Sequence, residues 1–129
     1  MTKRVLVVED NELNLKLFCD LLKAHGFMAE PVRDAREALD HARASRPDLI
    51  VMDIQMPHVS GLDLIEAIRS EERLRDTPIM AVTAYAGKGD EDRVRTAGAD
   101  AFVSKPITLT RFMDSITALI EETEMRLPQ

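Results

Sequence analysis

The sequence is poor in several residue types, and each shortage excludes a class of protein. One cysteine, Cys19, occurs among 129 residues, so no disulfide can form within the chain. Tryptophan is absent and aromatic residues make up 4%, so aliphatic side chains must build the core. The apolar runs are far too short to cross a bilayer, and the acidic pair Glu9-Asp10 leaves no room for a signal-peptide core.

Positive charge is also in short supply, since the formal net charge is −6. A surface of this sign repels a phosphate backbone, which argues against general nucleic-acid binding. The length suits one domain. We therefore expect a monomeric cytoplasmic protein without membrane insertion, with one domain over residues 1–123 and a flexible tail over 124–129.

Short apolar runs alternate with helical patterns along the chain. Four of the runs are strongly aliphatic, as buried parallel strands tend to be, and a weaker one suits an edge strand. The strong runs are 5–8, 49–52, 79–82 and 101–103, and the weak run is 28–32. Gly26 and Gly98 supply helix stops, and Thr108 caps the last helix. These five βα units predict an α/β fold with a parallel sheet covered by helices on both faces.

Side chains that can take part in chemistry follow four of the five predicted strands. Glu9 and Asp10 follow the first strand, Asp53 follows the third, Thr83 the fourth and Lys105 the fifth. Ligands of open α/β sheets bind beyond the carboxyl ends of the strands, so we expect these side chains to converge. Three neighbouring carboxylates repel one another and need a cation, and oxygen ligands beside a phosphate favour Mg²⁺.

The remaining two residues suit phosphate oxygens. Thr83 offers a hydroxyl and Lys105 a flexible ammonium group. Together with a carboxylate nucleophile at Asp53, they predict phosphoryl transfer to that side chain. Each residue alone would pass for an ordinary helix cap, turn residue or solvated loop, and only their joint placement carries the prediction.

Several segments resemble the receiver domain of two-component response regulators over nearly the full length. The matching segments are Val7-Val8-Glu9-Asp10-Asn11, Met52-Asp53-Ile54-Gln55-Met56-Pro57, Ser60-Gly61, Val82-Thr83-Ala84 and Ser104-Lys105-Pro106. The resemblance implies a flavodoxin/CheY-like (βα)5 fold with five helices and the strand order 2-1-3-4-5. Within the family, residues 9–14 and 85–91 are most similar to single-domain cell-division regulators of alphaproteobacteria.

The resemblance also implies roles for the residues of the site. Asp53 would accept a phosphoryl group from a phosphohistidine. Asp10, Asp53 and the backbone carbonyl of Gln55 would ligate Mg²⁺, with Glu9 acting through water. Thr83 and Lys105 would contact the phosphate.

Further residues would belong to the switch that follows phosphorylation. Phe102 matches an aromatic residue that changes rotamer as Thr83 moves. Gln55 and Tyr85 match positions that tune phosphate lifetime, and the bulk of Tyr85 predicts slow dephosphorylation. The Lys105-Pro106 bond matches one that is cis in the family.

The chain would then act by binding other proteins rather than as a conventional enzyme. The implied partners are a histidine kinase or histidine phosphotransferase, and a downstream kinase or adaptor in cell-cycle or developmental signalling. Two alternatives stay open. One is an interaction module with vestigial phosphorylation. The other is an aspartyl-phosphate phosphatase. Such enzymes have a D-x-D motif at the nucleophile, and here Gln55 stands in place of its second carboxylate.

One hydrophobic residue has two interpretations. The pattern places Leu17, Phe18, Leu21 and Leu22 on the core face of the first helix. Leu15 lies off that stripe, so it either contacts a kinase or phosphotransfer helix or covers the rim of the core.

Overall fold

The computed structural model describes residues 2–83, 89–105 and 107–126, in which strands and helices alternate. The strands are β1 (Arg4–Val8), β2 (Met28–Val32), β3 (Leu49–Asp53), β4 (Ile79–Thr83) and β5 (Ala101–Ser104). The helices are α1 (Glu12–Ala24), the 3-10 turn η1 (Ala35–Glu37), α2 (Ala38–Ser45), α3 (Gly61–Ser70), α4 (Asp90–Ala97) and α5 (Leu109–Arg126). None of the helices within these ranges has the length and apolar character needed to cross a membrane.

The five strands form one parallel sheet in the order β2-β1-β3-β4-β5, which confirms the predicted fold class. The weak strand β2 lies at an edge, where the missing N–H of Pro31 is tolerated because no further strand needs it. In the register of the central strands, Val8 pairs with Met52 and Asp53 pairs with Val82. The first and third strands therefore end side by side.

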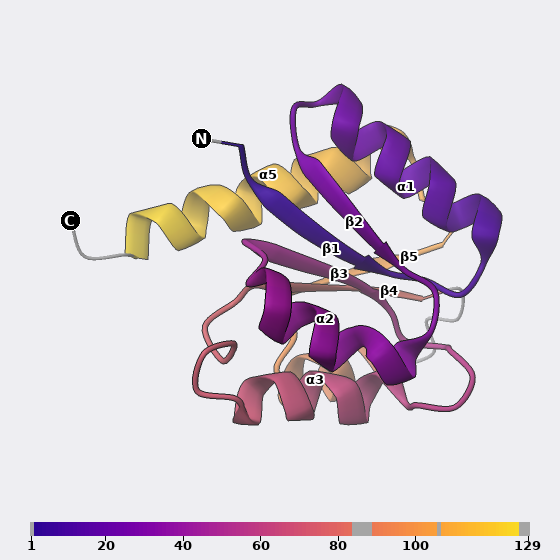
Figure 1. Cartoon of the computed structure of the whole chain (residues 1–129), viewed down its shortest axis with the longest axis vertical. Helices are drawn as coiled ribbons and strands as arrows, with labels where there is room; N and C mark the ends of the chain where they lie inside the picture. The colour runs from indigo at the N-terminus through magenta and orange to yellow at the C-terminus, as the bar shows by residue number, and fades with distance from the viewer. Residues whose placement is uncertain (1, 84–88, 106, 127–129) are drawn as a thin grey trace.

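The core consists of two layers, one on each face of the sheet. Alternate strand residues point to opposite faces, so Val5 and Val7 pack with α1 and α5, whereas Leu6 and Val8 pack with α2 and α3. Figure 1 shows α1 and α5 on one side of the sheet and α2 and α3 on the other. Because β1, β3 and β4 are covered on both faces, they are continuous apolar runs in the sequence.

The buried face of α1 differs from the predicted one. Its buried residues are Leu15, Phe18, Cys19 and Leu22. Leu17 is 46% exposed, whereas Leu15 is only 6% exposed and belongs to the core. The prediction oriented the helix by the apolar pair Leu17 and Phe18. The buried residues instead follow one another at three- and four-residue spacing from Leu15. The interpretation of Leu15 as a docking residue is therefore wrong.

Side-chain contacts hold both ends of the last helix, α5. Thr108 caps α5, because its hydroxyl oxygen accepts a hydrogen bond from the N–H of Arg111 at 3.2 Å. The helix continues to Arg126, so the tail boundary predicted at residue 124 falls inside it, and residues 127–129 lie outside the described part. Near its end, Glu124 pairs with the ammonium group of Lys3 at 3.0 Å. This ion pair joins the start of β1 to the end of α5.

One guanidinium group joins several segments at the end of the sheet where β4 and β5 begin. Arg69 of α3 pairs with the carboxylate of Asp100 at 2.8 Å, and Asp100 also accepts from the N–H of Ile79 at 2.9 Å. Arg69 donates further to the backbone oxygens of Gly98, Arg75 and Thr77 at 2.9, 2.9 and 2.6 Å. This Arg69 clamp holds the end of α3, the start of β4 and the loop after α4 together.

We expect Arg69→Met to lower the free energy of unfolding by about 2–4 kcal/mol, because Asp100 and three carbonyl groups would lose their common donor. Urea denaturation followed by circular dichroism measures this change. Lys16→Met is the control, since Lys16 forms a solvent-exposed ion pair with Asp20 on α1. A loss in Arg69→Met no larger than in the control would contradict the clamp.

Candidate functional site

The side chains predicted to act together gather at one edge of the sheet. Glu9 follows β1, Asp53 is the last residue of β3, Thr83 is the last of β4, and Lys105 follows β5. A 2.6 Å hydrogen bond from the N–H of Lys105 to the carbonyl of Thr83 extends the pairing of β4 and β5 by one step. The parallel ladder itself therefore delivers these residues to a common place.

Three of the residues form a compact acidic cluster. One carboxylate oxygen from each of Glu9, Asp10 and Asp53 can be chosen so that all three lie within 4.8 Å of one another. Glu9 is 1% exposed and Asp53 5% exposed, while Asp10 is half-buried. Such a set brings negative charge out of water, which costs free energy unless cations or hydrogen bonds compensate it.

Lys105 supplies the compensation from within the chain. Its ammonium group lies 3.2 Å from one oxygen of Asp53 and 3.2 and 3.4 Å from the two oxygens of Glu9. The other oxygen of Asp53 accepts from the N–H of Gln55 at 2.9 Å. One oxygen of Glu9 also accepts from the side-chain amide of Asn14 at 3.3 Å.

Burial and the neighbouring charges shift two pKa values in the site. Burial raises the pKa of Glu9 to about 7, and repulsion by Asp53 adds to this more than Lys105 offsets. Burial opposes the charge of Lys105, but the carboxylates of Asp53 and Glu9 outweigh it, so the pKa of Lys105 is raised above its ordinary value. Above about pH 7 the ionised Glu9 therefore adds its negative charge beside Asp53 and Lys105.

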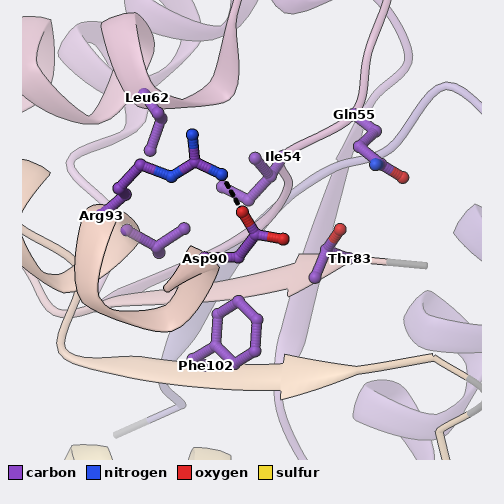
Figure 2. Close-up of a pocket in the computed structure, with 8 residues that line it drawn as sticks. Ile54, Gln55, Leu62, Thr83, Asp90, Arg93 and Phe102 are labelled. Atoms are coloured by element: carbon purple, nitrogen blue, oxygen red, sulfur yellow. Dashed lines mark hydrogen bonds and ion pairs between the residues drawn. The ribbon is translucent and has the colours of Figure 1, made fainter. Parts of the chain in front are cut away.

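A second feature lies behind Thr83. A cavity of about 230 Å³ opens between β4, β5 and α4, and its lining includes Ile54, Leu62, Val94 and Phe102. Figure 2 shows the ring of Phe102 at one side of this cavity and the ion pair of Asp90 with Arg93 at another. The cavity thus connects the end of β4 with the first turn of α4.

The structure brings together most of the residues predicted from the sequence. Glu9, Asp10, Asp53 and Lys105 form one cluster, and Thr83 and Phe102 line the adjoining cavity with Gln55. Tyr85 and Pro106 lie outside the described residues.

Two contacts were not predicted from the sequence. The amide of Asn14 reaches Glu9, and the Asp90–Arg93 pair borders the cavity. The first had a signal, since Asn14 stands three residues after the helix cap Asn11 and so faces back toward the end of β1.

Comparison with known proteins places this geometry in a family. The sequence model for the response regulator receiver domain matches residues 5–117. The chain belongs to the response regulator receiver family. Receiver domains typically bind Mg²⁺, and a cluster of carboxylate oxygens is the hard donor set that this ion prefers.

Relatives within the receiver family share most of their length with this chain. The polar-differentiation response regulator DivK of Brucella ovis is 52% identical over 120 residues, which covers 93% of this chain and 98% of the relative. DivK of Brucella anthropi is 51% identical over the same coverage. The chain is therefore a receiver similar to DivK over nearly the whole length of that protein.

Solved structures agree with this assignment. A CheY-like receiver domain protein from Methanospirillum hungatei matches with a TM-score of 0.92 at 26% identity, covering 98% of this chain and all of that one. The receiver domain of a histidine kinase from Syntrophus aciditrophicus matches with a TM-score of 0.88 at 28% identity, covering 99% and 96% of the two chains.

The raised pKa of Glu9 makes stability depend on pH. A folded-state pKa of about 7 against an ordinary 4.5 means that the folded protein retains a proton that the unfolded chain releases. The contribution is fully present below pH 4.5 and is lost as the pH rises through about 7. We therefore expect Glu9→Gln, in metal-free buffer at pH 8, to be more stable than the wild type by roughly 1–3 kcal/mol.

Urea denaturation between pH 4.5 and 8 measures the difference between the two proteins at each pH. The same change at an exposed position of α3, Glu66→Gln, provides the matched control. A difference between Glu9→Gln and the wild type that stays constant over this range would show that Glu9 does not titrate in it.

Proposed function

We propose that this receiver accepts a phosphoryl group on Asp53 from a phosphohistidine and thereby changes its affinity for partner proteins. The observation that carries the proposal is the shared contact of the Lys105 ammonium group with Asp53 and Glu9 at 3.2 Å. Such a site concentrates charge around one nearly buried carboxylate and keeps a cation beside it. Positioning and electrostatics of this kind make up most of phosphoryl-transfer catalysis.

In the proposed reaction, an oxygen of Asp53 forms a bond to phosphorus while the bond to the donor's histidine nitrogen breaks. Lys105 and the hydroxyl of Thr83 bind the phosphoryl oxygens. Asp10, Asp53 and the backbone carbonyl of Gln55 would hold Mg²⁺, with Glu9 acting through water, and the ion would supply positive charge opposite the carboxylates and the transferred group.

The phosphoryl group carries a charge of about −1.5 to −2 and several strong acceptors, so it attracts Thr83 and Lys105. Movement of Thr83 opens the cavity beside it to the ring of Phe102. The rotation of the ring changes the surface formed by α4, β5 and α5. The helix α4 is suited to move because only one of its residues, Val94, is buried.

The partners and the lifetime of the phosphorylated form belong to the same proposal. A histidine kinase or phosphotransferase supplies the group, and a kinase or adaptor reads it, in keeping with the similarity to DivK. Gln55 at the site and Tyr85, outside the described residues, are the proposed determinants of lifetime.

Acetyl phosphate tests the proposal without any protein partner. We expect the wild type, incubated with Mg²⁺ and acetyl phosphate, to gain the mass of one phosphoryl group, and Asp53→Asn to gain none. Intact-mass spectrometry measures the adduct. Omission of Mg²⁺, or Lys105→Ala, should slow its formation strongly, because either change removes cationic charge from the site.

Two results would favour the alternatives. Continuous release of phosphate from phosphate esters would indicate a phosphatase. An absence of any adduct, together with retained binding to a kinase, would indicate an interaction module in which phosphorylation is vestigial.

The switch has its own measurement in methyl NMR. On phosphorylation we expect the methyl signals of Ile54 and Val94 to shift, because the ring of Phe102 enters the cavity that they line. Phe102→Leu should abolish most of the shift, since leucine has no ring current, while leaving the phosphoryl adduct intact. Equal shifts in Phe102→Leu and in the wild type would refute this part of the mechanism.

A further inference from the structure

In the described part of the chain, two donors of different kinds hold the carboxylate of Glu9. Lys105 provides a charged group and Asn14 a neutral amide, which donates to Oε1 at 3.3 Å. Glu9 is 1% exposed, so water cannot replace either donor without rearrangement. A buried carboxylate in this position needs both its charge balanced and its direction fixed.

The two donors differ in what else they contact. Lys105 is shared, because its ammonium group also lies 3.2 Å from Asp53. When Asp53 gains a phosphoryl group, the added negative charge draws Lys105 toward it and away from Glu9. Asn14 carries no charge, so the same event does not draw it with comparable force.

Asn14 is itself fixed by the start of α1. Its backbone N–H donates to the side chain of Asn11 at 3.0 Å, and the N–H of Leu15 donates to the carbonyl of Asn11 at 2.9 Å. Leu15 is anchored in the core, so the first turn of the helix has little freedom. Asn14 thus contacts both the helix cap Asn11 through its backbone and Glu9 at the end of β1 through its side chain.

We propose that Asn14 is a positioning residue that holds Glu9 toward the metal site and leaves Lys105 available to the phosphoryl group on Asp53. This inference rests on the proposed function of the same site. Without Asn14, Lys105 is the remaining donor to the Glu9 side chain among the described residues, so the carboxylate is less well directed toward Mg²⁺ and the ammonium group is less available to Asp53.

Asn14 also lines an open groove with Leu17, Phe18, Lys105 and Ile107. A partner protein seated there would contact Asn14 directly, and a loss of phosphotransfer from a kinase would then have two explanations. Mg²⁺ binding and phosphorylation by acetyl phosphate involve no partner surface, so they isolate the effect through Glu9.

The test is a double-mutant cycle on Mg²⁺ affinity, measured by calorimetry in the absence of a phosphodonor. Asn14→Ala is made in the wild type and in Glu9→Gln, with Lys16→Ala on the same helix as an exposed control. We expect Asn14→Ala to weaken Mg²⁺ binding roughly 10-fold in the wild type. In the Glu9→Gln background the effect should fall below about 2-fold, because the carboxylate through which Asn14 acts is gone.

A second readout uses the metal-free protein. The ¹³C signal of the Glu9 carboxyl group should shift in Asn14→Ala and remain in place in Lys16→Ala. Asn14→Ser, which keeps a shorter donor, gives a second variant in case the alanine substitution disturbs the helix, and its loss of affinity should be intermediate.

Unchanged Mg²⁺ affinity in Asn14→Ala, or an equal loss in both backgrounds, would overturn the inference. Failure of the proposed function looks different, because the wild type would then bind Mg²⁺ but take no phosphoryl group from acetyl phosphate. The cycle still decides the role of Asn14 in that case.

Discussion

The repulsion among three carboxylates at one edge of the sheet is the constraint on which the rest of the structure depends. Parallel strands place their carboxyl ends together, and Glu9, Asp10 and Asp53 stand where β1 and β3 end. Lys105 reaches them because its backbone continues the pairing of β5 with β4. The fold therefore creates the electrostatic stress at the site and also delivers the cation that offsets part of it.

Much of this arrangement could be predicted from the sequence. Buried parallel strands are continuous apolar runs, so their ends are visible as the first polar residues, such as Asp53 after Leu49–Met52. The strand order could not be predicted in this way, because the apolar runs do not show that β1 lies between β2 and β3. That order came from the resemblance to receiver domains and is confirmed by the structure.

The errors and omissions have physical causes. Leu15 and Leu17 are both leucines two positions apart, and a small error in helical phase exchanges a buried residue for an exposed one. The spacing of Asn14 after Asn11 and of Arg93 after Asp90 permits each contact, but residue spacing alone does not fix which partner a polar side chain takes. Sequence patterns locate backbones well, whereas the pairing of polar side chains needs their coordinates.

The ion pair between Lys3 and Glu124 joins the start of β1 to the end of α5, and Figure 1 shows both on the side of the sheet opposite the carboxyl ends of β1 and β3. A domain whose termini meet in this way tolerates circular permutation well, since a short linker can close the old ends. For the same reason, a protein fused or immobilised through either end keeps the acidic cluster and the cavity behind Thr83 turned outward. The architecture thus separates the place where the molecule can be attached from the acidic cluster.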